Sequence, residues 1–324
     1  MSVLNRRTFL LASAAMVADS QHVGAAEFPE RPVTVIVPAA AGGVGDIIIR
    51  LLSPIMERSL GQPLVIDYRS GGGGTIGAQT VARARPDGHT LFLGDISNFA
   101  INQFMLPQVH FDPLSAFALI TRVADVPLVL FTNSSMPAKT LGEFIAYAKA
   151  NPGRVSYASP GVGTIPHLAV ERLKQLTGIE LVHVPYRGGA PALQALLANE
   201  VQLLLVGWGL GRSHVEARLV RALAVTTPRR QPSIPLPTAV ESGMPDFVAS
   251  NWWGLAAPQG TAGPVLDKIY RAVLTALADK TVQQRLDVQG FVPRGDAPQK
   301  FLEDMKAEAK IWAETISRGK LAIQ

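Results

Sequence analysis

Three glycine-rich turns are the segments of this chain best suited to bind a small ligand. Residues 38–46, 159–167 and 185–191 each follow an apolar run typical of a buried strand and precede a predicted helix. Glycine lets backbone N–H groups approach a ligand closely, and the first turn of a helix presents unpaired N–H donors at the positive end of its dipole. Because such turns bind anions without a dedicated lysine or arginine, their presence in both halves of the chain predicts an anion-binding cleft.

Some residues in and near these turns also have a purely structural interpretation. Asp46 and Thr164 are of the types that commonly cap a helix N-terminus. His167, at a predicted helix start beside the second turn, is the one histidine that we place near a ligand, and a capping or core role suits it equally well. We expect Trp252 and Trp253 to pack in the core.

A fourth glycine-rich segment indicates a different chemistry. Residues 72–77 read Gly-Gly-Gly-Thr-Ile-Gly, a formal dinucleotide-binding pattern, and Asp95 ends the next predicted strand. This pattern supports an alternative function, an exported NAD(P)- or flavin-dependent oxidoreductase. Arg69 and Ser70 count against it, because they separate the preceding strand from the first glycine, and the following helix is short.

Composition excludes several other classes of protein. The chain has 324 residues, 48% of them hydrophobic, and no cysteine, so it is neither disordered nor held by disulfides or an iron–sulfur cluster. The net charge of +5 is small and the basic residues are scattered, which disfavours nucleic acid as a partner. The six histidines lack metal-ligand spacing, and common hydrolase and nucleotide motifs are absent. We expect no metal, no cofactor and no enzymatic activity.

The first 26 residues have the features of an export signal. Arg6 and Arg7 lie in a twin-arginine (Tat) pattern, an apolar stretch follows, and small residues precede a cleavage site near Ala26. An ordinary secretory (Sec) signal is the alternative. No later stretch reaches the roughly 18 apolar residues of a membrane-spanning helix, so we expect a soluble protein in the periplasm.

The rest of the chain alternates short apolar runs with amphipathic stretches, which indicates an α/β fold. Its length favours two lobes. Pro54 is expected to kink or restart the first helix, and Gly61 to end it. Strands are predicted at 33–37, 64–68, 90–94, 126–132, 155–158, 181–184, 201–206, 219–226 and 252–257, and helices at 46–60, 76–84, 141–150, 167–176, 192–199, 265–278 and 298–317.

Over nearly its whole length after residue 26, the sequence resembles the Bug-type (TctC-like) periplasmic receptors of tripartite tricarboxylate transport systems. The resemblance rests on ordered segments at 28–32, 42–46, 76–78, 86–90, 100–102, 111–113, 183–191, 221–225, 236–243 and 253–258. It implies a two-lobed periplasmic-binding-protein (Venus-flytrap) fold with a ligand cleft. Lobe 1 would comprise residues 27–126 plus 248–324, and lobe 2 residues 127–247.

The resemblance also implies a monomeric receptor that binds a small organic carboxylate through backbone amides and ordered waters and passes it to a membrane transporter. A periplasmic sensor for a signalling partner is a further alternative. Residues 71–77 become a structural turn rather than a nucleotide cradle. The ligand-binding positions carried over are Ala41, Gly42, Gly43 and Asp46 in lobe 1 and Ser159, Gly163, Thr164, Gly189 and Ala190 in lobe 2.

Two segments depart from the family pattern and extend the candidate site. Gly207 and Trp208 replace an Asp or Asn and a Pro-Ser segment, and a wall built from them would favour an apolar or aromatic ligand body. Asp95, Ser97 and Asn98 lie in a loop usually rich in Gly, Ser and Thr. Asp95 would repel a ligand carboxylate if its side chain pointed into the cleft.

Overall fold

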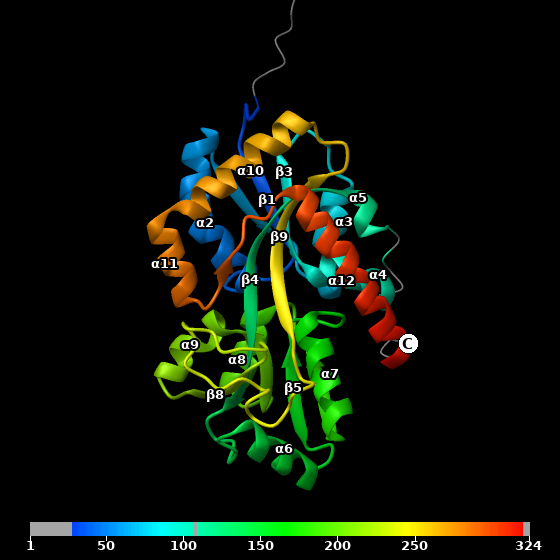
Figure 1. Ribbon diagram of the computed structural model, residues 1–324, viewed down its shortest axis with the longest axis vertical. Coiled ribbons are helices and arrows are strands. Elements are labelled where there is room, and N and C mark those ends of the chain that lie inside the picture. The colour runs from blue at the N-terminus through cyan, green and yellow to red at the C-terminus, as the bar shows by residue number, and fades with distance from the viewer. Residues whose placement is uncertain (1–27, 107–108, 110, 320–324) are drawn as a thin grey trace, which may run out of the picture.

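The computed structural model describes residues 28–106, 109 and 111–319. The predicted leader, residues 1–26, therefore lies outside the described part of the chain. Figure 1 shows two α/β lobes, one above the other, and the long strand β4 (Phe117–Asn133) runs from one into the other. No helix among the described residues is long and apolar enough to span a bilayer.

The upper lobe is built on a mixed sheet with the strand order β2-β1-β3-β9-β4. The first three strands are parallel, and β9 and β4 run antiparallel to their neighbours. Their bounds are β1 Val33–Val37, β2 Leu64–Tyr68, β3 Thr90–Asp95, β4 Phe117–Asn133 and β9 Ser250–Pro258, with the short β10 Val292–Pro293 paired to β4.

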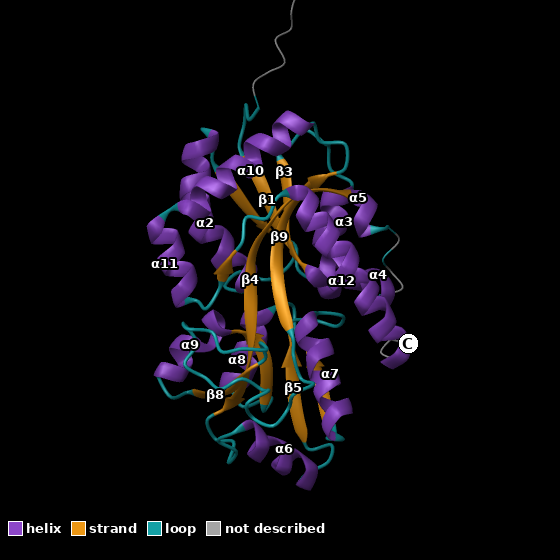
Figure 2. Cartoon of the chain, viewed as in Figure 1, coloured by secondary structure: helices purple, strands orange, loops and turns teal. Residues whose placement is uncertain are grey.

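Helices cover both faces of this sheet (Figure 2). On one face α2 (Val44–Leu60), α10 (Gly263–Ala278) and α11 (Lys280–Val288) bury an aliphatic core. The other face carries α3 (Thr75–Ala82), the π-helical turn η2 (Ser97–Ile101), α4 (Asn102–Met105), α5 (Pro113–Ala116) and α12 (Pro298–Gly319). There Phe99, Trp252 and Phe301 form an aromatic cluster in which neighbouring ring centroids lie 5.2–5.9 Å apart.

In the lower lobe, β4 continues as the central strand. It pairs antiparallel with β7 (Leu203–Gly207) and β8 (Val220–Val225). The parallel strands β5 (Val155–Ser159) and β6 (Leu181–Pro185) extend the sheet beyond β7. The helices of this lobe are α6 Leu141–Ala150, α7 Ile165–Thr177, α8 Gly189–Leu197 and α9 Trp208–Glu216.

The two lobes are connected where β4 changes its pairing partner. Val126 and Pro127 still pair with Asn251 and Ser250 of β9, whereas Leu128 pairs with Gly207 of β7. The chain thus crosses between the lobes at least twice, as the resemblance implied. The proposed lobe boundaries at 126/127 and 247/248 fall within a few residues of these crossings and stay a prediction.

The sequence anticipated most elements but not all of them. Gly61 ends α2 in the left-handed conformation as expected, whereas α2 runs through Pro54 as one helix without a restart. The buried side chains of Ile48, Leu52 and Met56 hold the turns on either side of the proline against the sheet. Four helices, α4, α5, α9 and α11, were missed, and β4 is longer than expected because polar residues interrupt its apolar pattern.

The aromatic cluster predicts that α12 is essential to the upper lobe. Phe301 is fully buried against Phe99 and Trp252, so Phe301→Ala should lower the free energy of unfolding by about 3–5 kcal/mol. Urea unfolding followed by circular dichroism measures this change. Phe104→Ala is the matched control, because Phe104 is 40% exposed and should lose far less. Equal losses in the two variants would contradict this packing assignment.

Candidate functional site: a cleft between the lobes

A cavity of about 710 Å³ lies between the two lobes. Its upper wall comes from the loops after β1, β2 and β3, and its lower wall from the loops after β5, β6 and β7. The carboxyl ends of strands in open α/β sheets are the usual place for a ligand. The crossing strands close its back through Val126, Leu128, Asn251 and Trp253.

The lobes touch each other around this cavity. The hydroxyl of Ser97 in the upper lobe accepts a hydrogen bond from the backbone N–H of Ile165 in the lower lobe (3.0 Å). The N–H of Ala40 donates to the carbonyl of Arg187 (3.3 Å). Ser97 was predicted to bind ligand, but it is fully buried in this inter-lobe contact and does not line the cavity.

The first glycine turn is shaped by Asp46 from behind the wall. One carboxylate oxygen accepts from the N–H of Gly42 (2.7 Å), and the other accepts from the Arg50 guanidinium (2.6 Å) and the Tyr68 hydroxyl (2.5 Å). Gly43, rather than Asp46, occupies the N-cap position of α2. Asp46 therefore fixes the loop that carries Gly43 into the wall and does not face the cavity itself.

The second turn rests on a pair of stacked histidines. The rings of His167 and His183 lie 4.2 Å apart, and His183 Nε2 contacts the Ser159 hydroxyl at 2.6 Å. His167 Nδ1 accepts a hydrogen bond from the N–H of Gly163 (3.3 Å). Burial lowers the pKa of His167, and burial together with the neighbouring His167 lowers the pKa of His183 to about 4. The stacked pair supports the loop from below, while Thr164 lines the cavity.

The third turn contributes a cation that sequence analysis did not assign to the site. Arg187 lines the cavity, is exposed, and its guanidinium forms no hydrogen bond or ion pair with any described residue. Helix α8 begins directly after it, and Gly188 at the N-cap provides no capping side chain. The cleft therefore contains an arginine, contrary to the expectation of a site built from uncharged amides alone.

The fourth glycine segment also forms part of the wall. Gly71, Gly72, Gly73 and Gly74 line the cavity and all have positive φ angles. The side-chain amides of Asn98 and Asn102 both donate to the carbonyl of Gly73, at 3.0 and 2.9 Å. The segment is thus more than the structural turn that the resemblance implied, because it presents bare backbone to the cleft.

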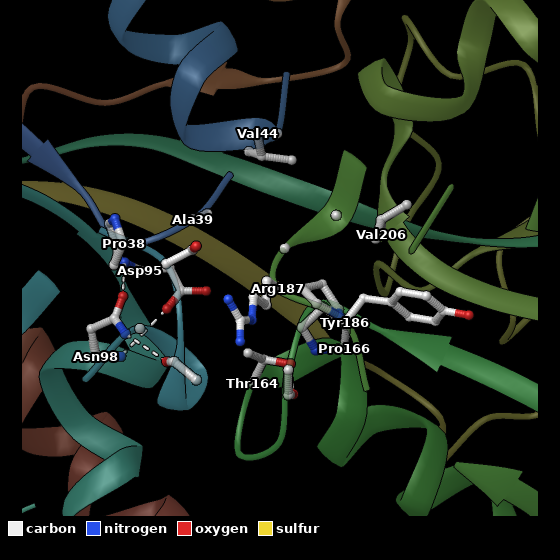
Figure 3. A pocket seen from close by; sticks show the side chains of 18 of the residues that line it. Pro38, Ala39, Val44, Asp95, Asn98, Thr164, Pro166, Tyr186, Arg187 and Val206 are labelled. Carbon is white, nitrogen blue, oxygen red and sulfur yellow. Dashed lines mark hydrogen bonds between the residues drawn. The ribbon is translucent and has the colours of Figure 1, made fainter. Parts of the chain in front are cut away.

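Asp95 ends β3 with its carboxylate at the cavity (Figure 3). One oxygen accepts from the N–H groups of Ser97 (3.0 Å) and Asn98 (3.4 Å), and the other accepts from the Asn251 side chain (3.1 Å). Burial raises the pKa of this carboxyl, and the hydrogen bonds from these neighbours oppose the rise. Trp208, which was predicted to form a wall of the cleft, does not line the cavity, whereas Trp253, which packs in the upper-lobe core as expected, also lines it. Trp208 stacks on Phe131 with centroids 6.2 Å apart.

Five of the residues predicted from the sequence lie in the wall and nine lie outside it. Those in the wall are Gly43, Asn98, Thr164, Gly189 and Gly207. Those outside it are Ala41, Gly42, Asp46, Ser97, Ser159, Gly163, His167, Ala190 and Trp208. Contact of any of them with a ligand stays a prediction. The described residues contain no cluster of His, Cys, Asp or Glu that could hold a metal ion.

Two α/β lobes joined by crossing strands around a cavity define a two-lobed solute-binding protein. The sequence matches the model of the tripartite tricarboxylate transporter family receptor over residues 48–321, so the chain belongs to that family. It is 34% identical to Protein BugT of Bordetella pertussis over 296 residues, 91% of either chain.

Two solved structures that resemble the chain were determined with ligands. One is R. palustris Rpa4515 with adipate (TM-score 0.88, 32% identity, 91% of this chain and 99% of that one). The other is MatC (Rpa3494) from Rhodopseudomonas palustris with bound malate (TM-score 0.85, 32% identity, 89% of this chain and 100% of that one). Both named ligands are small organic carboxylates. The family is one of transporter receptors, which lends no support to the oxidoreductase alternative.

The contact between the lobes at Gly73 predicts a variant that prevents closure. A Cβ atom at Gly73 would lie 2.4 Å from the carbonyl oxygen of Val162 in the opposite lobe, so Gly73→Ala should hold the lobes apart. Gly61→Ala is the matched control, because Gly61 has a similar positive φ and nothing within 4 Å of its Cβ position. Both variants should lose roughly 1 kcal/mol of stability through backbone strain.

Spin labels measure the separation of the lobes directly, since the chain has no native cysteine. Cysteines at the exposed positions Ser59 and Lys149 place one label on each lobe. Gly73→Ala should reduce the population with the short inter-lobe distance, whereas Gly61→Ala should leave the distribution unchanged. Identical distributions in the two variants would rule out this contact as a requirement for closure.

Proposed function

We propose that this protein is a non-catalytic receptor that captures a small organic carboxylate between its lobes and delivers it to a membrane transporter of the tripartite tricarboxylate type. The unpaired guanidinium of Arg187 in the cleft is the observation that carries the proposal. Guanidinium groups bind carboxylates through two parallel hydrogen bonds. The adipate- and malate-bound relatives support the same ligand class.

Backbone amides at the two adjoining helix starts complete the anion site. Gly43 and Gly188, the N-cap residues of α2 and α8, lie in the cavity wall, and neither helix is capped by a side chain. Their first-turn N–H groups are therefore free to donate to a ligand carboxylate. At α7, by contrast, the N–H of Ile165 is already bonded to Ser97. We infer that α2 and α8 hold the carboxylate together with Arg187.

Closure of the lobes is the proposed signal to the transporter. The ligand would bridge the α2 start in one lobe and Arg187 in the other, and so favour the closed arrangement over an open one. The Ser97–Ile165 and Ala40–Arg187 hydrogen bonds add to this preference, since they too join the lobes. Rotation about the crossings in β4 and β9 would open the cleft.

We further propose that the receptor acts in the periplasm as a monomer after removal of residues 1–26 by the twin-arginine route. Membership of the family supports the compartment. The sequence pattern at Arg6 and Arg7 supports the route.

Arg187→Gln tests the anion site. In a thermal-shift panel of mono-, di- and tricarboxylates, a bound ligand at about 100 times its Kd should stabilise the wild type by about 2.7 kcal/mol. Loss of the guanidinium should weaken binding roughly 10- to 100-fold, because a hydrogen bond to a charged group contributes about 1.5–3 kcal/mol. Arg154→Gln, an exposed lower-lobe arginine away from the cavity, should bind as the wild type does. A panel without any response would refute the proposed ligand class.

Gly43→Asp tests the start of α2 independently. Gly43 has a φ of −81°, so aspartate fits the backbone there. Its carboxylate would occupy the wall position at which the ligand carboxylate is expected, and like charges repel. Calorimetry should show binding abolished with the fold retained. Gly142→Asp on the open surface of α6 controls for the added charge, and retained affinity in Gly43→Asp would exclude this loop.

A further inference from the structure

The cleft carries opposite charges on its two lobes. Among the described residues that line it, Asp95 is the only acid and Arg187 the only base. Asp95 extends from the end of β3 in the upper lobe, and Arg187 from the loop after β6 in the lower lobe. Figure 3 shows both side chains directed into the space between the lobes. No ion pair within 4.0 Å joins the two described side chains, so each is available to a molecule placed between them.

Asp95 is held in place as a hydrogen-bond acceptor. Ser97 and Asn98 donate to one oxygen, and the Asn251 side-chain amide donates to the other. The Asn251 amide cannot present its oxygen instead, because that oxygen accepts from the N–H of Trp252 at 2.8 Å. The carboxylate therefore cannot swing away from the cavity to accommodate an acceptor on the ligand.

The lining between the two charges is mostly apolar or bare backbone. Ile76, Leu106, Val126 and Leu128 contribute hydrocarbon side chains, and the glycines of 71–74 contribute none. A ligand body with further charged groups would find no counter-charge there. The ligand that suits this cavity has two polar ends and an apolar middle.

We propose that the carboxylate captured by this receptor carries a hydrogen-bond donor, an ammonium or a hydroxyl group, that pairs with Asp95 while its carboxylate pairs with Arg187. This inference rests on the proposed carboxylate-binding function and narrows it to amino- and hydroxycarboxylates. A second carboxylate at the same position would face Asp95 at close range in a buried site, where like charges are weakly screened. Simple dicarboxylates such as adipate, the ligand of one relative, should therefore bind poorly.

Three matched series of ligands test the proposal with the wild-type protein. The series are ω-amino carboxylates, ω-hydroxy carboxylates and unbranched dicarboxylates of the same chain lengths, titrated by calorimetry. At the best length the ω-amino compound should bind at least tenfold more tightly than the dicarboxylate, with the ω-hydroxy compound between them. Equal or tighter binding of the dicarboxylate would overturn the inference and leave the carboxylate receptor standing. Binding of none of the three series would overturn both.

The variant Asp95→Asn shows whether Asp95 causes the preference for ω-amino carboxylates over dicarboxylates. The ratio of dicarboxylate to ω-amino carboxylate affinity should shift at least tenfold toward the dicarboxylate, whereas Asp267→Asn on the exposed surface of α10 should leave it unchanged. In Asp95→Asn the introduced side-chain amide would face the side-chain amide of Asn251. The double variant Asp95→Asn with Asn251→Asp restores a donor–acceptor pair between these two side chains and keeps the native packing and net charge. An unchanged ratio in a folded Asp95→Asn protein would overturn the inference.

Discussion

The antiparallel ladder between β4 and β9 is the interaction on which the rest of this structure depends. It pairs the strands from Phe117–Pro258 to Pro127–Ser250, and β4 then continues into the lower sheet. Each lobe has its own covering helices, but the two sheets share β4 as a strand. The register of this ladder sets where the lobes face each other. It also places Asn251 and Trp253 at the back of the cleft.

Bare backbone forms much of the cleft, and the residues behind it give that backbone its shape. Asp46 fixes the first turn, the His167–His183 stack supports the second, and Asn98 with Asn102 holds the carbonyl of Gly73. Glycine is required at Gly73 because its φ is positive and the opposite lobe approaches closely. The polar side chains of these loops thus bond mainly to the protein's own backbone. The N–H groups at the helix starts are left to bind a ligand.

Two charged residues, one from each lobe, line this cleft. Arg187 and Asp95 face the same space from different lobes, so the polarity of the site develops only when the lobes come together. The carboxylates named for two relatives define a ligand class, adipate and malate, that spans simple and hydroxylated diacids. Asp95, supported on three hydrogen bonds, is the feature by which this chain would select within that class.

The sequence alone determined the fold class, the family, most strands and helices, and the loops that surround the cleft. These follow from local patterns, since apolar periodicity specifies the elements, and glycine at strand ends marks close backbone approach. The direction in which each side chain of those loops points was decided by the tertiary structure. Ser97 and Asn98 are adjacent, yet one joins the lobes and the other lines the cavity.

The two tryptophan segments likewise show that the sequence did not determine which side chains line the cleft. Trp208 opens α9 and turns onto Phe131, while Trp253 lies opposite Asp95 in the β3–β9 register and lines the cleft. No local pattern distinguishes them, because the outcome depends on which strand becomes the neighbour and in which register it pairs. Likewise, the sequence placed Arg187 in a glycine turn, but only the approach of the other lobe put it opposite Asp95. Local sequence preferences determine the helices, strands and turns of this receptor. Long-range strand pairing determines which side chains meet in its cleft.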